Sequence, residues 1–462
     1  MKNQMLCIFA LVFFFAGVAL AQPTIEWQKS LGGSANEKAH SIQQTFDGGF
    51  IITGWTRSNN GDVSGYHGGG SCDAGDYWVV KLDAESPSSI VWQKCLGGSL
   101  GDAANSIQQT TDGGYVVVGF TNSNDGDVSG NHGLSDYWVV KLNSSGSIEW
   151  QRCLGGSDYD GAYFIQQTTD SGYIIAGLSY SNDGDVSGNH GGEDYWVVKL
   201  NAGGGVVWQK CLGGSSTEEA YSIQQTIDGG FIVAGGTTSN DGDVSGNHGG
   251  YDYWVVKLNA SGSIEWQRSL GGSNNDFARS IQQTTDGGYI VAGYSESNDG
   301  DVTGNHGSLD YWVVKLDSTG NIVWQKCLGG SHFDWALSIQ QTGDGGYIVA
   351  GESWSIDGDV TGNHGVNDYW IVKLSPETGI SEHFTPQKLA ISVNPNPFNS
   401  ACAITAPEDA IVEIFDIEGR KINKLPGGEQ VWKPEVSVGS GVYLVRAKIG
   451  DKDITKRIVY LK

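Results

Sequence analysis

Apolar and polar positions alternate along this chain in short runs that recur at a fixed spacing. One copy consists of SIQQT at 106–110, YVVVGF at 115–120, DYWVVKL at 136–142 and SIEWQR at 147–152. The runs are rich in β-branched and aromatic residues, and Gly, Asp, Asn and Ser separate them, as turns separate strands. The pattern therefore predicts four antiparallel strands per repeat, with a tight turn at Asp112-Gly113-Gly114 joining the first two.

The repeat occurs six times. The Trp of its third strand is found at Trp78, Trp138, Trp196, Trp254, Trp312 and Trp370, a step of 60 residues once and 58 residues four times. Six repeats of four strands predict an all-β fold, a six-bladed β-propeller. The array begins at Ile25-Glu26-Trp27-Gln28-Lys29, which matches a fourth strand, and ends at 368–374, which matches a third. We expect these two strands to pair and close the ring.

The remaining segments predict a chain of several parts. Residues 1–21 have the form of a signal peptide, with Lys2, an apolar run at 6–18 and Ala19-Leu20-Ala21 at its end. We expect the propeller over 22–374, a linker over 375–388 and a small immunoglobulin-like β-sandwich over 389–462, where the composition changes to short strands. No later run approaches the roughly 18 apolar residues of a membrane helix.

Charge narrows the range of partners. The chain has 27 basic and 52 acidic side chains, a formal net charge of −25, and from Pro386 onward it has 11 basic and 9 acidic ones. The acidic excess therefore lies in the repeats, and a field of that sign repels nucleic acid and anionic lipid but attracts metal cations. We expect a monomer with neither nucleic acid nor a membrane as its partner.

Four cysteines share one position in the repeat, after Trp-Gln-Lys or Trp-Gln-Arg: Cys95, Cys153, Cys211 and Cys327. Equivalent positions of neighbouring repeats should lie beyond the roughly 7 Å Cα separation that a disulfide tolerates. We expect small buried thiols at these four positions. The sequence assigns no role to Cys72 or Cys402.

Two resemblances follow from these strings. DGGYIVAG, DYWVVKL and IVWQKCLGG resemble a class of exported bacterial β-propeller repeat proteins over roughly residues 25–374. The tail, with NPNPF, VEIFDIEGR, SGVYLVR and KRIVYLK, resembles the C-terminal sorting domain of the type IX secretion system, although FlgD-like immunoglobulin domains share some of these features. The resemblance to a sorting domain implies secretion or attachment to the outer cell surface, with the secretion machinery as a partner.

The loop before DYWVVKL contains the most specific motif. It reads D-x-D-x-[ST]-G-x5-D, which has the spacing of a twelve-residue calcium loop with oxygen ligands at positions 1, 3, 5 and 12. The alternative is that Asp, Asn and Gly form turns here and that the last Asp caps the strand. The candidate calcium ligands are Asp125, Asp127, Ser129 and Asp136; Asp183, Asp185, Ser187 and Asp194; Asp241, Asp243, Ser245 and Asp252; Asp299, Asp301, Thr303 and Asp310; and Asp357, Asp359, Thr361 and Asp368.

One histidine recurs in each of these loops, at His132, His190, His248, His306 and His364. A single His per loop is a weak zinc signal, so we expect it to brace the loop by a hydrogen bond.

Function should lie where the repeats differ, since a repeated residue is a poor candidate for a unique role. Two variable rings are expected on the loop-rich face, together with variable tips between the blades. The first ring is His40, Asn105, Tyr163, Tyr221, Arg279 and Leu337; the second is Arg57, Asn122, Tyr180, Thr238, Glu296 and Trp354; the tips are 158–160, 218–219 and 332–335. Aromatic side chains beside carboxylates suit the binding of a sugar or peptide, and drift at solvent positions is the alternative. The candidate ligand-binding residues are His40, Tyr163, Tyr221, Arg279, Arg57, Tyr180, Trp354, Asp160, Glu218, Asp334 and Trp335.

Three functional hypotheses result. The first is an exported propeller that binds a glycan or protein through its loop-rich face, with calcium as a candidate cofactor. The second is a polysaccharide hydrolase or lyase of the same fold that uses carboxylates such as Asp160, Glu218 and Asp334. The third is a structural component of a surface layer.

Overall fold

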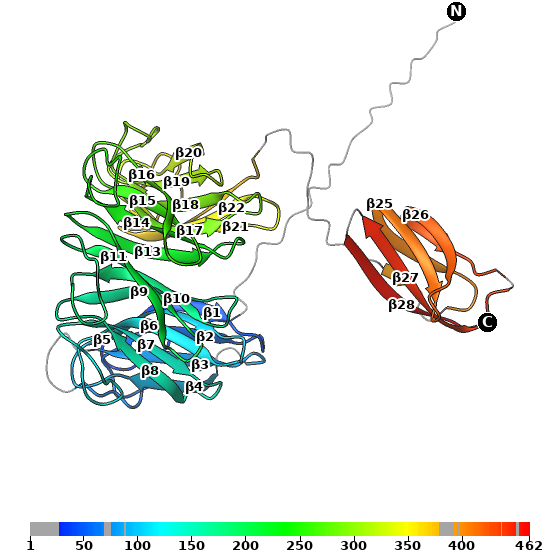
Figure 1. Cartoon of the computed structure of the whole chain (residues 1–462), viewed down its shortest axis with the longest axis horizontal. Coiled ribbons are helices and arrows are strands. Elements are labelled where there is room, and N and C mark those ends of the chain that lie inside the picture. Colours follow the sequence, from blue (N-terminus) through cyan, green and yellow to red (C-terminus); the bar gives the residue numbers. More distant parts are fainter. Residues whose placement is uncertain are drawn as a thin grey trace, which may run out of the picture. The chain divides into compact units, whose positions relative to one another are not determined.

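The computed structural model describes residues 27–68, 75–86, 89–377, 392–394, 398–435, 437–449 and 452–462 (Figure 1). These residues form the predicted all-β chain, with six successive blades of a propeller followed by a separate small β domain. The predicted signal peptide, residues 378–388 of the predicted linker and Cys72 lie outside the described residues. Within the described part of the chain, no helix is long and apolar enough to span a membrane.

Each of the first five blades is an antiparallel sheet of four strands in chain order, as the pattern predicts. Their bounds are β1 (Glu37–Gln44), β2 (Phe50–Thr56), β3 (Asp76–Leu82) and β4 (Ile90–Leu96); β5 (Asp102–Gln109), β6 (Tyr115–Thr121), β7 (Asp136–Leu142) and β8 (Ile148–Leu154); β9 (Asp160–Gln167), β10 (Tyr173–Ser179), β11 (Asp194–Leu200) and β12 (Val206–Leu212); β13 (Glu218–Gln225), β14 (Phe231–Thr237), β15 (Asp252–Leu258) and β16 (Ile264–Leu270); β17 (Asp276–Gln283), β18 (Tyr289–Ser295), β19 (Asp310–Leu316) and β20 (Ile322–Leu328).

Neighbouring blades are joined by an aromatic pair that repeats around the propeller. Tyr137 of β7 stacks obliquely on Trp196 of β11, with ring centroids 4.5 Å apart. Its hydroxyl donates a hydrogen bond of 2.9 Å to the Trp196 carbonyl oxygen. Both side chains are fully buried, so each pair fixes one blade on the next. Equivalent Tyr-to-Trp bonds start from Tyr77, Tyr195, Tyr253 and Tyr311.

The sixth blade contains β21 (Asp334–Gln341), β22 (Tyr347–Ser353) and β23 (Asp368–Leu374), which form a sheet of three strands in the described residues. Ile25 and Glu26 of the predicted closing strand lie outside the described residues, and Trp27, Gln28 and Lys29 have no strand assignment. Closure of the ring by this segment therefore stays a prediction.

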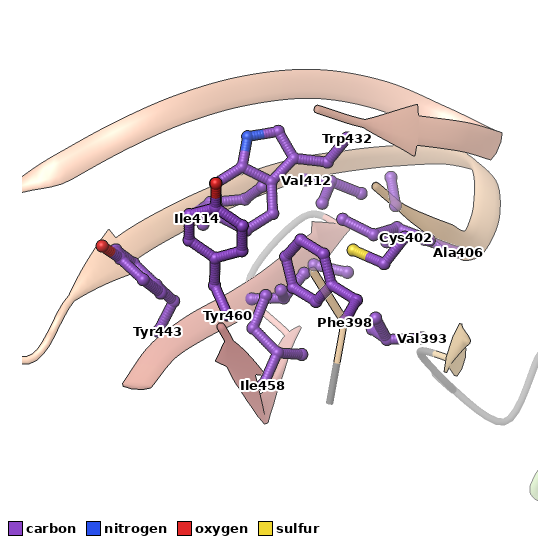
Figure 2. Close-up of a cluster of buried hydrophobic side chains, with 14 residues drawn as sticks. Val393, Phe398, Cys402, Ala406, Val412, Ile414, Trp432, Tyr443, Ile458 and Tyr460 are labelled. Atoms are coloured by element: carbon purple, nitrogen blue, oxygen red, sulfur yellow. The ribbon is translucent and has the colours of Figure 1, made fainter. Parts of the chain in front are cut away.

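The C-terminal domain is an antiparallel sheet of β24 (Ser392–Asn394), β25 (Cys402–Asp416), β27 (Gly441–Ile449) and β28 (Lys452–Tyr460), with β26 (Lys421–Trp432) paired to β25. It curves around a core of apolar side chains (Figure 2). Phe398, the last residue of the NPNPF string, lies in that core, stacked on Tyr460 at 5.2 Å and edge-on to Trp432 at 5.6 Å. This small sheet, curved around one core, confirms the small β-sandwich expected at the end of the chain.

The four repeated cysteines confirm their prediction. Cys95, Cys153, Cys211 and Cys327 are buried free thiols, and so is Cys402 of the C-terminal domain. Burial raises the pKa of the Cys153 thiol to about 12, so it stays protonated and unreactive at neutral pH.

Candidate ligand-binding pocket on the propeller

The first strand of each of the first five blades contains a β-bulge at the position of the first variable ring. The register of β17 with β18 shifts between Ala278 and Ser280, which leaves Arg279 without a partner on the neighbouring strand. A bulge residue is released from the alternation of the strand and can point its side chain in a new direction. The other bulge residues are His40, Asn105, Tyr163 and Tyr221. One variable position of the repeat therefore lies where the backbone is irregular.

A second contact brings residues of adjacent blades together at the same end. The backbone N–H of Asp276 donates to the carbonyl oxygen of Tyr251, in the loop before β15, at 2.5 Å. The N–H of Asp334 donates in the same way to Leu309, before β19, at 2.7 Å. Each long loop thus lies beside the first strand of the next blade, and the side chains next to these bonds form a common surface.

A cavity of about 370 Å³ lies on this surface, over the fourth, fifth and sixth blades. We call it the aromatic pocket, and its lining consists of Glu219, Tyr251, Asn275, Phe277, Arg279, Tyr294, Glu296, Leu309 and Trp335. The volume falls within the range of small-molecule sites, roughly 300–1,000 Å³. The lining combines aromatic rings with two carboxylates, an amide and a guanidinium.

Arg279 is held by aromatic rings. Its guanidinium carbon lies 4.0 Å from the ring centre of Tyr221, 4.8 Å from that of Phe277 and 5.9 Å from that of Tyr294. Within the described residues, no carboxylate forms an ion pair with it. Stacking therefore fixes the orientation of the guanidinium while its charge stays available to a ligand.

The two carboxylates of the pocket are oriented by neutral donors. The Tyr221 hydroxyl donates to Glu219 Oε2 at 2.7 Å, and the Tyr251 hydroxyl donates to Glu219 Oε1 at 3.4 Å. Asn275 Nδ2 donates to Glu296 Oε2 at 2.9 Å. Burial and the charge of Glu219 raise the pKa of Tyr251 to about 12, so its hydroxyl keeps its proton. Both carboxylates can accept further hydrogen bonds from a ligand, since each oxygen has several acceptor positions.

The structure brings together four of the predicted ligand-binding residues. Arg279 and Trp335 line the pocket, and the ring of Tyr221 packs against the guanidinium of Arg279. Tyr163 stacks on Tyr221 at 4.4 Å, so it is a further layer behind the lining. Trp354 lies outside the pocket, edge-on to Phe333 at 5.6 Å, and is 37% exposed.

Other predicted ligand-binding residues lie elsewhere. The ring Nδ1 of His40 is 2.9 Å from the Ala104 carbonyl oxygen, and burial lowers its pKa. Arg57 lies over the ring of Trp55 at 5.0 Å. Tyr180 is 44% exposed, beside Glu193 in the third blade. These three do not line the aromatic pocket.

Asp160, Glu218 and Asp334 have no exposed surface. Asp160 Oδ2 accepts hydrogen bonds from Gly156 N at 2.8 Å and from Ser181 Oγ at 2.9 Å. Glu218 and Asp334 make the equivalent bonds to Gly214 N and Gly330 N. These carboxylates therefore fasten the Leu-Gly-Gly turn of the preceding strand and do not reach the pocket.

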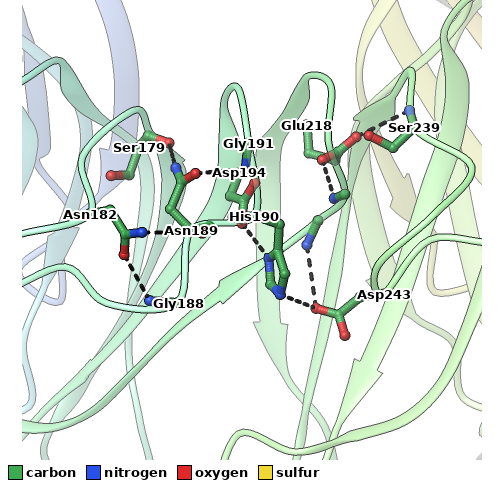
Figure 3. A network of polar contacts seen from close by, with 12 residues as sticks. Ser179, Asn182, Gly188, Asn189, His190, Gly191, Asp194, Glu218, Ser239 and Asp243 are labelled. Atoms are coloured by element: carbon green, nitrogen blue, oxygen red, sulfur yellow. Dashed lines mark hydrogen bonds and ion pairs between the residues drawn. The ribbon is translucent and has the colours of Figure 1, made fainter.

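The Asp-rich loops are held by protein contacts (Figure 3). His190 binds Asp194 through Nδ1 at 2.7 Å, and its Nε2 lies 3.9 Å from Asp243 Oδ2 of the next blade. The same bond from His to the strand-capping Asp recurs at His132, His248, His306 and His364. The prediction that the histidine braces its loop is confirmed.

Two other candidate calcium ligands of this loop, Asp183 and Ser187, have separate partners. Asp183 Oδ1 accepts from Ser157 N at 2.7 Å, and Ser187 Oγ accepts from Gln209 Nε2 at 2.5 Å. Gly188 supplies the left-handed backbone that the turn requires, with φ of 89°. Among the described residues, no three His, Cys, Asp or Glu side chains are grouped to hold a metal ion. Calcium binding by the loops stays a prediction.

Residues 392–461 match the family model of the secretion system C-terminal sorting domain. The tail is a type IX sorting domain. The sorting domain implies that the chain interacts with the type IX secretion machinery, which places it outside the cell or on its outer surface. The domain covers only the end of the chain, so it describes delivery and leaves the ligand of the propeller open.

Other similarities are more distant. The regulatory protein FlaEY of Caulobacter vibrioides is 28% identical over 232 residues, which are 46% of this chain and 24% of that protein. PorZ, a surface component of the type IX secretion system of Porphyromonas gingivalis, is 10% identical with a TM-score of 0.31, over 96% of this chain and 61% of that one. A puromycin hydrolase is 12% identical with a TM-score of 0.36, over 80% and 57%. The chain thus spans less than two thirds of each of these proteins.

Five residues of the pocket lie outside both the variable rings and the predicted tips: Tyr251, Asn275, Phe277, Tyr294 and Leu309. The sequence marks some of these residues by their variation among the repeats. The residue before DYW differs in every copy, including Tyr251 and Leu309, and so does the second residue of the first strand, including Phe277 and Trp335. Variation at these positions marks the pocket as clearly as the two rings do.

Proposed function

We propose that this exported propeller is a glycan-binding protein and that the aromatic pocket is its binding site. The observation that carries the proposal is the composition of the cavity, where aromatic side chains, two carboxylates, an amide and a guanidinium converge. A sugar ring has apolar C–H faces that pack on aromatic rings, and hydroxyl groups at its rim that donate and accept hydrogen bonds. Trp335 and Tyr294 suit the faces, and Glu219, Glu296 and Asn275 suit the hydroxyls.

Comparison with the other cavities of the propeller supports this choice. Three further cavities, of about 430, 510 and 470 Å³, occupy equivalent places between blades. Each is lined by the same elements of the repeat, among them the loop His and the Gln of the fourth strand. Repeated linings follow from the shared architecture. The aromatic pocket combines side chains that differ from their counterparts in other blades.

The hydrolase or lyase alternative has less support. It assigns the chemistry to Asp160, Glu218 and Asp334, whose carboxylates are fully buried and hydrogen-bonded to backbone and hydroxyl groups. A substrate cannot reach them without opening the turns that they fasten. No such obstacle exists for binding at the pocket.

The proposal is tested with the full chain and an array of gluco-, manno- and galacturono-oligosaccharides, followed by calorimetry of each hit. We expect binding that Trp335→Ala and Glu219→Gln each weaken by about tenfold or more, the loss of roughly 1.4 kcal/mol. Tyr159→Ala is the control, because Tyr159 is 50% exposed on the third blade and does not line the pocket. Absence of any carbohydrate binding, or binding that survives both pocket variants, would refute the proposal.

A further inference from the structure

The aromatic pocket is part of a longer row of rings. Successive ring centroids are 4.4 Å apart between Tyr163 and Tyr221, 5.3 Å between Tyr221 and Phe277, 5.9 Å between Phe277 and Tyr294 and 6.1 Å between Tyr294 and Trp335. The row continues from Trp335 to Phe333 at 6.3 Å and from Phe333 to Trp354 at 5.6 Å. We call these seven residues the aromatic tract; it extends over four consecutive blades, from the third to the sixth.

The two ends of the aromatic tract differ in accessibility. At one end, Tyr163 stacks on Tyr221 nearly parallel to it, with 16° between the ring planes, and the Arg279 guanidinium lies over the same ring. Tyr221 is therefore enclosed by its neighbours. At the other end, Phe333 is 39% exposed and Trp354 is 37% exposed. A ligand that extends beyond the pocket along the tract therefore meets exposed ring surface at Phe333 and Trp354.

The exposed end is also fixed in place. The backbone N–H of Trp354 donates to the Phe333 carbonyl oxygen at 2.8 Å, so the segment after β22 is tied to the segment before β21. The two rings meet edge to face, with 86° between their planes. Rings held in this way lose little conformational freedom when a ligand covers them, which favours binding. Exposed aromatic side chains next to a polar pocket are thus a preformed extension of it.

We infer that the ligand of the pocket is an oligosaccharide chain, with one unit in the aromatic pocket and the following units on Phe333 and Trp354. This inference rests on the proposed function. A cavity of about 370 Å³ encloses little more than a single sugar unit, at the lower end of the usual range for ligand sites. The remaining units leave along the aromatic tract, where ring surface continues to Phe333 and Trp354 and offers packing partners to the sugar faces.

A series of increasing chain length tests the inference. Calorimetry of the full chain is carried out with the best glycan from the array, from the monosaccharide to the hexasaccharide. We expect the affinity to rise by about tenfold or more from the shortest to the longest chain, because each stacked unit adds contact area. The double variant Phe333→Ala with Trp354→Ala should remove this gain and leave the affinity for the shortest binding chain unchanged.

The outcomes separate the two proposals. Equal affinity for short and long chains, or a gain with length that survives the double variant, would overturn the extended site while the pocket stands. Weaker binding of every chain length on Trp335→Ala, with a length dependence that the double variant abolishes, supports both. Tyr159→Ala is the matched control, since Tyr159 holds the position of Phe333 in the third blade. Far-UV circular dichroism and melting curves confirm that each variant is folded.

Discussion

Asp136 and Asp160 both place carboxylate oxygens beside the backbone of Gly155, at the interface between the second and third blades. A Cβ added to Gly155 would lie 2.6 Å from Asp136 Oδ1 and 2.6 Å from Asp160 Oδ2. Both residues are fully buried. The pair recurs as Asp76 with Asp102, Asp194 with Glu218, Asp252 with Asp276 and Asp310 with Asp334. Burial raises the pKa of Asp136 to about 6 and the charge of Asp160 adds to the rise, so Asp136 takes up a proton at a higher pH than an exposed carboxyl group does.

The propeller should therefore gain stability on mild acidification. Burial raises the pKa of Asp102, Asp136, Asp194 and Asp252 to about 6. A carboxyl group whose pKa is higher in the folded than in the unfolded chain binds more protons when folded, so the free energy of unfolding rises as pH falls from about 7 toward 4. The opposite sign holds for Asp47, whose pKa the hydrogen bond from Thr45 lowers to about 2.

Stabilisation by groups such as Asp47 is lost as pH falls below about 4, so stability should be greatest between pH 4 and 6. Melting followed by circular dichroism from pH 3 to pH 8 checks this. A melting temperature that falls steadily below pH 7 would contradict it. Asp136→Asn is a direct control, because it removes one titrating group and should flatten the rise between pH 7 and 5.

Gly155→Ala should destabilise the second blade interface. The new Cβ would meet both buried carboxylates at 2.6 Å, where neither side chain has room to withdraw. Overpacking of this kind costs about 1–3 kcal/mol. Gly161→Ala is the matched control, because a Cβ at Gly161 in β9 meets no atom within 4 Å. Denaturant unfolding of the two variants should show a loss for Gly155→Ala only, and equal stabilities would refute the contact.

Closure of the ring gives a third prediction. Tyr195 of β11 is fully buried and donates to the Trp254 carbonyl oxygen at 2.9 Å, whereas Tyr369, its counterpart in β23, is 93% exposed. If residues 25–29 complete the sixth blade and dock it on the first, Tyr369 should occupy the same environment as Tyr195. Tyr369→Phe and Tyr195→Phe should then both lower the free energy of unfolding by about 1 kcal/mol.

Deletion of residues 22–29 is the independent test of closure. It should lower the melting temperature and make Tyr369→Phe silent, because the deletion already removes the partner strand. A silent Tyr369→Phe in the intact chain, beside a destabilising Tyr195→Phe, would show that the sixth blade is not docked in this way.

Export should depend on the sorting domain. Phe398, Trp432 and Tyr460 form its core, and residues 392–461 match the sorting family. In a host with type IX machinery, we expect a chain truncated after residue 377 to remain inside the cell envelope while the intact chain reaches the surface or medium. A fusion of residues 378–462 to an unrelated exported protein should carry that protein out. Cell fractionation with immunoblotting measures where each chain is found. Export of the truncated chain would refute the dependence on the sorting domain.

The residue pattern within each repeat predicted most of the fold, because the strand residues, the turn residues and the repeat spacing all indicate the same structure. The β-branched and aromatic content of DYWVVKL predicted the strands that contain Tyr137 and Trp196, and the Asp-Gly-Gly turns predicted the hairpins. The site was harder to predict, since it depends on contacts between blades. Asp160 looked like a surface carboxylate beside Tyr159, yet it turns inward to bind Gly156 N. The sequence could not show this, because the partner belongs to the turn before the strand.

The aromatic pocket could also be predicted only in part, because contacts between blades bring its residues together. Arg279 and Trp335 were identified from their variation, but Tyr251 joins them through a backbone bond from its carbonyl oxygen to Asp276 of the next blade. Register within a blade is readable from alternation, whereas the neighbour across a blade interface is set by the bulge and by the loop. The proposed binding site depends on the second kind of contact.

Calcium is the last prediction. Weak extracellular sites with affinities near 10⁻⁴ M, at about 1 mM calcium, would each contribute roughly 1.4 kcal/mol. In the third loop, Asp183 already accepts from Ser157 N and Asp194 is paired with His190, so calcium would have to share these carboxylates with the protein donors or displace them. A calorimetric titration of the full chain with calcium, and melting curves in calcium and in chelator, test the calcium hypothesis, and no heat with no shift would leave the loops as turns. A large rise in calcium, with about five sites that Asp183→Asn reduces by one, would instead establish the loops as calcium sites and require calcium in every glycan assay.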